Sequence, residues 1–122
     1  MKFTREMPGA LTIHSVSDDQ IRIGNQVFGD VVAMTAGALL NDWPAKAIDD
    51  LIESDFAMLL DTHPEVIILG TGNNNVFPPR ELVFAMARRG VGFEVMNTRA
   101  AASTFNVLVG EGRQVAAVLY SQ

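Results

Sequence analysis

The chain has 122 residues, 48% of them hydrophobic and 19% charged, which predicts one folded domain with a substantial core. Its net charge of −5 argues against a nucleic-acid-binding protein, which needs a basic face. Cysteine is absent, so disulfides, thiolate nucleophiles and Cys-ligated zinc or iron–sulfur centres are excluded.

The beginning of the chain gives no sign of export. Residues 1–10 (MKFTREMPGA) are expected to be a loose lead-in, and they contain no apolar run of signal-peptide length. No apolar run anywhere approaches the roughly 18 residues that a membrane helix needs. We therefore expect a cytoplasmic protein that is not inserted in a membrane.

The first third of the chain predicts short antiparallel strands. Leu11–Val16 and Ile21–Ile23 combine β-forming residues with apolar alternation, and the pattern resumes at Val27-Phe28. Gly24 stands at the first central position of a two-residue turn, which suits a type II′ hairpin because that position needs positive φ. A further strand is expected at Val31–Thr35. This part is therefore predicted to be an antiparallel hairpin or meander.

The middle of the chain is less clearly patterned. For Ala36–Leu51 the sequence gives no firm prediction, although Trp43-Pro44 argues against a helix because the residue before proline avoids helical geometry. Ser54 is the expected N-cap of a short helix over residues 55–62. That helix would place Phe56, Leu59 and Leu60 on one side.

The second half alternates strands and helices. Strands are expected at 66–69, 91–95 and 115–120, the first helix opens at Pro78-Pro79 and ends at Gly90, and the second is capped by Asn97 or Thr98 and ends at Gly110 and Gly112. This β-α-β-α-β order implies parallel strands with right-handed crossovers, as in half of a Rossmann-like fold. With the N-terminal strands it predicts a single α/β domain, residues 1–122, built on a mixed sheet.

A glycine-rich turn follows the first of these strands, where a dinucleotide-binding loop would lie. Gly70-Thr71-Gly72 provides two of the three glycines of that fingerprint, but Asn75 occupies the third position. Pro78 and Pro79 lack amide hydrogens where an anion would be held. Asn97 stands where the ribose-binding acid is expected. The pattern therefore favours an ordinary strand-to-helix turn without a bound cofactor.

The carboxyl ends of parallel strands meet at one edge of a sheet, where α/β proteins bind their ligands. We expect that edge to carry the candidate binding residues Gly70, Thr71, Gly72, Asn73, Arg80, Asn97, Thr98 and Arg99. Each has a plainer interpretation: Arg80 as a solvated arginine near a carboxylate, Asn97 or Thr98 as a helix cap. Together they define one candidate surface, whatever binds there, and Arg80 could contact an anion or an acidic partner at its rim.

No catalytic or metal-binding set is recognisable. The two histidines, His14 and His63, lack ligand spacing, and no GxSxG elbow is present. The acidic pairs Asp18-Asp19 and Asp49-Asp50 are not placed to divide acid and base roles. Trp43 is expected to pack in or near the core, and if exposed it would be a partner anchor.

Several stretches resemble one family. GTG at 70–72, RELVFAMARRG at 80–90, FEVMNT at 93–98 and TFNVLVGEGRQVAAVL at 104–119 are similar to the uncharacterised Mth-type domain family. That family includes the mitochondrial complex I assembly factor usually numbered third and an adipogenesis-associated domain protein. The most specific part of the pattern is Thr98, Thr104, Asn106, Leu108, Glu111, Gly112 and Arg113.

The resemblance implies a compact α/β domain with no established enzymatic activity and no cofactor. The mitochondrial relatives act in assembly through protein contacts, so we expect a stand-alone, non-enzymatic protein-binding domain that uses the predicted edge. The alternative is a small-molecule site, or an enzyme acting on an anionic metabolite, in the same crevice. The chain could also function as a homo-oligomer.

Overall fold

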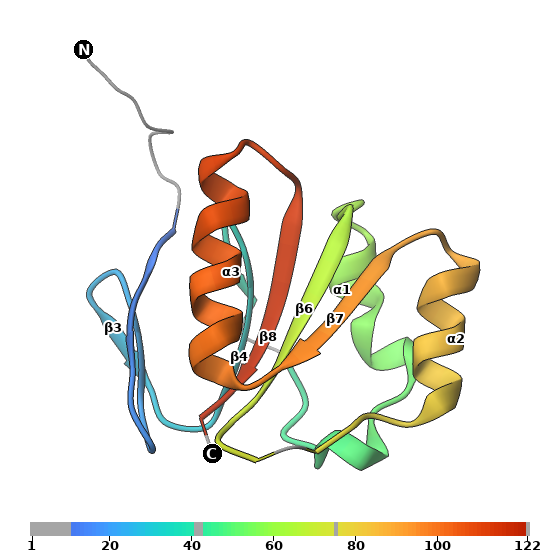
Figure 1. Cartoon of the computed structure of the whole chain (residues 1–122), viewed down its shortest axis with the longest axis horizontal. Coiled ribbons are helices and arrows are strands. Elements are labelled where there is room, and N and C mark those ends of the chain that lie inside the picture. Colours follow the sequence, from blue (N-terminus) through green and yellow to red (C-terminus); the bar gives the residue numbers. More distant parts are fainter. Residues whose placement is uncertain (1–10, 41–42, 75, 122) are drawn as a thin grey trace.

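The computed structural model of the protein describes residues 11–40, 43–74 and 76–121, so the predicted lead-in and Asn75 lie outside the described residues. A mixed five-stranded sheet in the order β5-β4-β8-β6-β7 forms its centre (Figure 1). β6 pairs in parallel with β7 and β8, and β4 pairs antiparallel with β8 and β5. The strands are β4 (Val31–Thr35), β5 (Leu39–Leu40), β6 (Val66–Thr71), β7 (Gly92–Met96) and β8 (Val115–Tyr120). The predicted α/β domain with a mixed sheet is confirmed.

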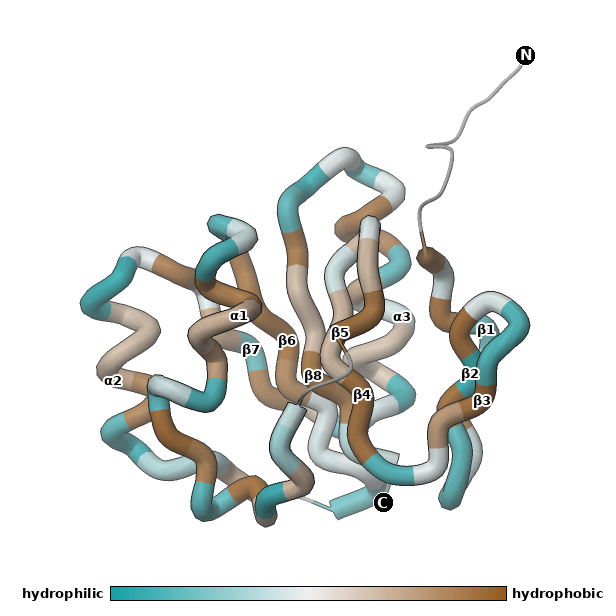
Figure 2. The backbone as a smooth tube through the Cα atoms, turned by 180° about the vertical axis from the view of Figure 1, so that it is seen from behind, coloured by the Kyte–Doolittle hydropathy of each residue, from teal (hydrophilic) through white to brown (hydrophobic). Residues whose placement is uncertain are grey.

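Helices cover both faces of this sheet. All six residues of β6 are buried, as expected for a strand covered on both sides. Ile68 faces the cluster built on α3 (Thr98–Gly110), whereas Ile67 faces the cluster that includes Leu82 of α2 (Arg80–Arg88). The second face is also covered by the 3₁₀ helices η1 (Ile48–Asp50) and η2 (Glu53–Phe56) and by α1 (Ala57–Leu60). In Figure 2 the apolar segments follow the central strands, and the hydrophilic ones gather at the turns.

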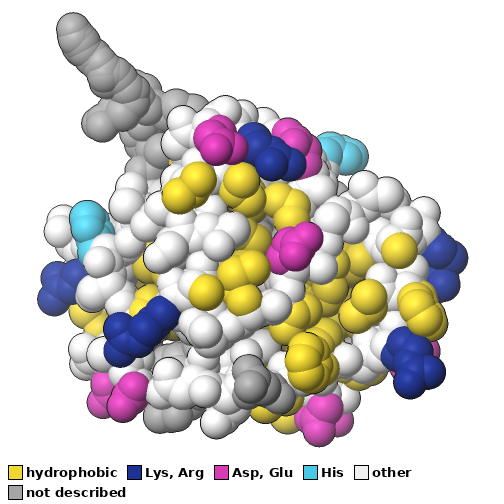
Figure 3. Space-filling view, viewed as in Figure 1, with side chains coloured by type: hydrophobic (Ala, Val, Ile, Leu, Met, Phe, Trp, Pro, Cys, Tyr) yellow, Lys and Arg dark blue, Asp and Glu magenta, His cyan; other side chains and the backbone are white. Residues whose placement is uncertain are grey.

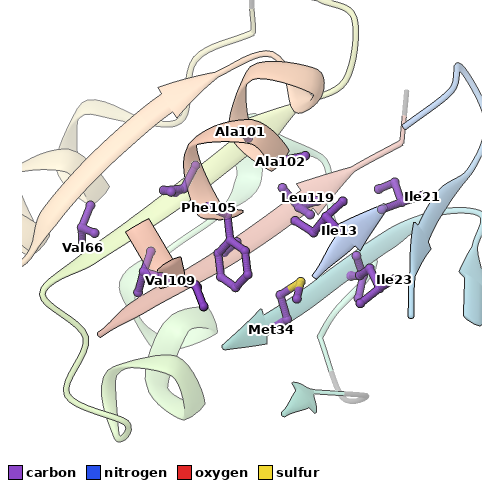
Figure 4. Close-up of a cluster of buried hydrophobic side chains, with 14 residues drawn as sticks. Ile13, Ile21, Ile23, Met34, Val66, Ala101, Ala102, Phe105, Val109 and Leu119 are labelled. Carbon is purple, nitrogen blue, oxygen red and sulfur yellow. The ribbon is translucent and has the colours of Figure 1, made fainter. Parts of the chain in front are cut away.

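The N-terminal meander is present but forms a sheet of its own. β1 (Ile13–Val16), β2 (Ile21–Ile23) and β3 (Gln26–Phe28) pair antiparallel in that order, so of the predicted N-terminal strands only β4 joins the central sheet. The reason is packing: the isoleucines of β1 and β2 are buried in one cluster with Met34 and Phe105 (Figure 4). Gly24, in the β2–β3 turn, has φ +58, as the type II′ turn requires.

One side chain holds this small sheet against α3. The amide oxygen of Asn106 accepts a hydrogen bond from the Ile13 N–H at 3.0 Å, and its amide nitrogen donates to the Ile13 carbonyl at 2.9 Å. Asn106 therefore satisfies both backbone groups of Ile13, as a neighbouring strand residue would. The contact joins residues 93 positions apart in sequence.

The helix ends follow the predicted signals with two corrections. Gly90 and Gly112 have positive φ, and the N–H of the residue after each bonds back to the last turn, Val91 to Met86 and Arg113 to Leu108. Gly110, predicted to help stop the helix, is instead its last residue. It remains helical because Gly112 supplies the left-handed residue that ends the turn.

The second correction concerns the short helix before β6. It begins as η2 at Glu53 and is capped by Asp55, not by Ser54. The Asp55 carboxylate accepts hydrogen bonds from the Ile52 N–H at 2.9 Å and from Lys46 Nζ at 2.8 Å. The same carboxylate therefore caps the helix locally and pairs with Lys46, nine residues away, and the second contact is not visible in the local pattern.

No helix within the described ranges is long and apolar enough to cross a membrane.

Replacing Asn106 with Ala should release β1 from α3, because the buried backbone groups of Ile13 lose their partners. We expect the free energy of unfolding to fall by about 1–3 kcal/mol. Hydrogen exchange should accelerate at the Ile13 amide and in β2, but not in β6. Unchanged exchange at Ile13 would show that the small sheet is held by its isoleucines alone.

Candidate functional site

The carboxyl ends of the three parallel strands are joined by the hydroxyl of Thr98. Its Oγ1 accepts a hydrogen bond from the Gly72 N–H at 2.7 Å and donates to the Tyr120 carbonyl at 2.6 Å. The Thr98 N–H also donates to the Gly72 carbonyl at 3.0 Å. Thr98 is 1% exposed, so it belongs to the interior and not to the surface.

Gly70 and Thr71 complete this junction. A Cβ on Gly70 would lie 2.8 Å from the Thr98 Oγ1 and 3.1 Å from the Ala101 Cβ, so only glycine lets α3 approach β6 this closely. The Thr71 hydroxyl donates to the Asn74 carbonyl at 2.8 Å and closes the turn. The Gly72 N–H, which a phosphate loop would offer to its ligand, is already bonded to Thr98. These contacts agree with an ordinary strand-to-helix turn.

The two asparagines of the predicted edge also have structural partners. The Asn97 side chain accepts from the Ala100 N–H at 2.8 Å and caps α3, as its position predicted. Asn73 is exposed, and its amide donates to the Asp18 carboxylate at 2.9 Å, which links the β6–α2 loop to the β1–β2 turn.

Arg80 and Arg99 are the exposed charged members of the edge. They lie in the first turns of α2 and α3, which both begin along the lower edge of Figure 1, where β6, β7 and β8 end. Three ion pairs join described residues, and neither arginine takes part in them. Figure 3 shows basic side chains distributed around the rim of the molecule and not gathered into one patch.

The residues of the family pattern make structural contacts as well. Thr104 lies 3.6 Å from the Met96 sulfur, and Arg113 forms an ion pair with Glu65 at 3.1 Å. Asn106 and Gly112 act as described above, and Glu111 is exposed at the end of α3.

A cleft of about 420 Å³ opens at the carboxyl ends of β6 and β8. Thr71 is the only member of the predicted edge that lines it. Much of its wall comes from residues 45–49, in a segment whose structure could not be predicted from the sequence. Asp30 and Asp49 also line the cleft, whereas the ammonium of Lys46 is paired with Asp55. The charge of the cleft therefore does not favour binding of an anion.

The half-buried Tyr120 borders the cleft. Its hydroxyl donates to the Lys46 carbonyl at 2.8 Å. Burial raises the pKa of Tyr120; the nearby Trp43 indole opposes this and the Asp55 charge adds to it, so the pKa is raised overall. The phenol therefore stays neutral at physiological pH. The half-buried Trp43 packs edge-on against Phe56 at 4.8 Å, and its Nε1 finds no hydrogen-bond partner among the described residues.

The outer side of α2 and the loop before it carry exposed aromatic rings near acidic groups. Reasoning from the sequence did not identify this surface. Phe77 and Phe84 are 72% and 53% exposed. Glu81 and Arg88 are the helix-surface neighbours of Phe84, and both line a groove of about 500 Å³ between α2 and the η1–η2 segment. We define the α2 flank as Asp49, Asp50, Ile52, Glu53, Phe77, Glu81, Phe84 and Arg88. In Figure 3 hydrophobic side chains gather over the side of the molecule that carries α2.

Phe77 and Phe84 carry a signal that was visible in the sequence. Phe84 falls outside the Leu82, Ala85, Met86 stripe that the helix buries, so the periodicity places it toward solvent. The groove beside it could not be anticipated, because its other wall is the unpredicted segment. The described residues contain no group of three or more His, Asp or Glu side chains arranged to hold a metal ion.

Comparison with known proteins gives a consistent picture. A family model described as "Protein of unknown function (DUF498/DUF598)" matches residues 13–120. The chain is 34% identical over 117 residues to NADH dehydrogenase [ubiquinone] 1 alpha subcomplex assembly factor 3 of Mus musculus, covering 93% of this chain and 62% of that protein. It therefore spans less than two thirds of that curated relative. It is also 33% identical over 72 residues to a 13 kDa major membrane protein of Francisella tularensis, covering 59% of this chain and 58% of the relative.

Solved structures share the fold. An NMR structure from Xanthomonas campestris superposes with a TM-score of 0.84 at 30% identity, covering 91% of this chain and 84% of that one. A Bordetella pertussis protein, described as an Mth938-like domain, has a TM-score of 0.79 at 25% identity, covering 99% and 92% of the two chains.

Replacing Thr98 with Val tests the junction. The substitution keeps the shape of the side chain but leaves the Gly72 N–H and the Tyr120 carbonyl without their partner, which should cost about 2–4 kcal/mol of unfolding free energy. Thr98→Ser is the matched control, because it keeps the hydroxyl and should cost about 1 kcal/mol. Equal stability of the Val variant and the wild type in urea unfolding would contradict the assigned role.

The Asp55 cap predicts an acid dependence of stability. Burial raises the pKa of Asp55, but the hydrogen bonds from Lys46 and the Ile52 N–H and the charge of Lys46 outweigh it, so the pKa lies below its ordinary 3.8. A lowered native pKa gives stability that is fully present above the unfolded pKa and is lost as the pH falls through the native value. Asp55→Asn should therefore cost about 1 kcal/mol near neutral pH.

The difference between wild type and Asp55→Asn should then shrink below about pH 4. Urea unfolding from pH 7 to pH 2.5 measures it. The exposed Asp61, replaced by Asn, serves as the control and should show little effect at any pH. A stability difference that stays constant down to pH 2.5 would rule out the carboxylate as its source.

Proposed function

Because the chain belongs to the DUF498/DUF598 family, the Mth-type family that its sequence resembles, we propose that it is a non-enzymatic binding domain that docks a protein partner on the α2 flank. The name of its Mus musculus relative, an assembly factor, supports a role in protein assembly. The chain spans only 62% of that relative. A role in assembling a respiratory complex is therefore proposed here and is not transferred from the relative's name.

The observation that carries the proposal is the exposure of two phenylalanine rings. Phe77 and Phe84 are 72% and 53% exposed, and neither belongs to a core cluster. Aromatic side chains are enriched among the residues that dominate binding energy at protein interfaces. Neighbouring exposed apolar groups rimmed by polar residues are typical of interaction sites.

The charge of the flank indicates the chemistry of the partner. Four carboxylates line the groove beside Phe84, those of Asp49, Asp50, Glu53 and Glu81, and Arg88 lines it as well. The Glu53 carboxylate is paired with Arg89, which leaves three acidic groups and one arginine outside that pair. A partner segment with lysine or arginine next to an apolar anchor would complement this arrangement and associate faster at low salt. The exposed Arg80 borders the flank at the start of α2 and is the member of the sequence-predicted edge that we assign to it.

Two other roles remain proposals with weaker support. A small molecule could occupy the 420 Å³ cleft beside Tyr120, where Asp30 and Asp49 favour a neutral or cationic ligand over the anionic metabolite of the alternative hypothesis. The same flank could join two copies of this chain, which sedimentation of the wild type would reveal. We propose a cytoplasmic location for the interaction, and a relative named as a membrane protein is the reason to probe membranes too.

The double variant Phe77→Ser, Phe84→Ser should lose its partner in pull-downs from soluble and membrane fractions of the native host. We expect recovery to fall at least about tenfold, because each anchor typically contributes more than about 1 kcal/mol. Val107→Ser is the matched control: Val107 is 58% exposed on α3, away from the flank. Arg80→Glu removes a positive charge bordering the flank and should therefore leave recovery of a basic partner undiminished.

Loss of the same partner from Val107→Ser, or full recovery with the double variant, would remove the α2 flank from the proposal. The circular dichroism spectra of all variants should match the wild type, because the replaced side chains are exposed.

A further inference from the structure

A second surface lies between the small sheet and α3. There β1 and α3 enclose a groove of about 290 Å³, to which no role has been assigned so far. The small sheet stands on the side of α3 away from α2 (Figure 1), so this groove is separate from the α2 flank. Its chemistry also differs, because no carboxylate lines it.

The walls of the groove are held at a fixed spacing. Asn106 bonds both backbone groups of Ile13, so β1 cannot shift relative to α3 without breaking two hydrogen bonds. Ile13 and Ala102 supply apolar contacts at this boundary, and both belong to the buried cluster drawn in Figure 4. A site built on two packed elements needs little ordering when a ligand binds.

The remaining lining is rich in hydrogen-bond donors. Arg99 and Ser103 come from α3, and His14 and Ser15 from β1. Arg99 takes part in none of the ion pairs among described residues. Guanidinium, imidazole and hydroxyl groups can all donate to an oxyanion. In a chain with a net charge of −5, an arginine and a histidine in one groove without a carboxylate are a local exception.

We propose that this groove binds the phosphate group of a small molecule. A carboxylate is matched by one arginine through two parallel hydrogen bonds, whereas a tetrahedral phosphate accepts from donors on several sides. The groove presents such a set, with Arg99 and Ser103 on one wall and His14 and Ser15 on the other. Arg99, which the sequence assigned to the candidate edge with Gly70–Gly72, lines this groove together with residues of β1.

This proposal does not depend on the protein partner. The α2 flank is acidic and the groove carries no acid, so a phosphate ligand and a basic partner segment are directed to different sides of the molecule. Failure of one leaves the other intact.

An NMR titration of the full chain with inorganic phosphate, at constant ionic strength set with chloride, tests the site. We expect saturable shifts of the amides of His14, Ser15 and residues 99–103. Arg99→Gln should weaken binding about tenfold. Ser103→Asp should abolish it, because it places a carboxylate in the groove without removing a core side chain.

The matched control is Arg113→Gln. It removes one positive charge just beyond the opposite end of α3, in an exposed ion pair that contributes little to stability, and it should bind phosphate as the wild type does. Equal loss in Arg99→Gln and Arg113→Gln would overturn the proposal, as would non-saturating shifts spread over all arginines. Succinate, titrated in parallel, should bind more weakly, and tighter binding of succinate would contradict the assignment to phosphate.

Discussion

The hydroxyl of Thr98 is the constraint on which the carboxyl-terminal edge of the sheet depends. It joins the loop after β6, the start of α3 and the end of β8, and it can do so only because Gly70 has no Cβ between the helix and the strand. Buried donors and acceptors need partners, so this arrangement consumes the polar groups that a ligand would otherwise use. At the edge that resembles a nucleotide site, the Gly72 N–H and the Tyr120 carbonyl are therefore already hydrogen-bonded to Thr98.

The sequence predicted the parts of the fold that local patterns determine. The unbroken apolar run of β6 indicated a strand covered on both faces, and Asn97 and Gly90 marked helix ends. The separate small sheet was not predictable, because its placement depends on isoleucines that meet Phe105 from distant parts of the chain. The ion pair between Lys46 and Asp55 was missed for the same reason, because it joins residues nine positions apart.

The same limit applies to the candidate site. Residues at strand ends could be assigned to one edge, but their burial could not be read from spacing, and Thr98 proved 1% exposed. The two open surfaces arise where helices meet segments distant in sequence: α2 against the η1–η2 segment, and α3 against β1. One is acidic with exposed phenylalanines and the other is rich in donors, so the molecule presents two chemically opposite faces.

Docking of a protein partner on the α2 flank is the proposal on which the function rests. A photo-crosslinking amino acid placed at position 84 in the native host, and at position 107 as a reference, tests it most directly. We expect one discrete crosslinked protein from position 84, joined through a peptide that contains lysine or arginine, and none from position 107. The same crosslinked protein from both positions, or an acidic peptide at position 84, would contradict it.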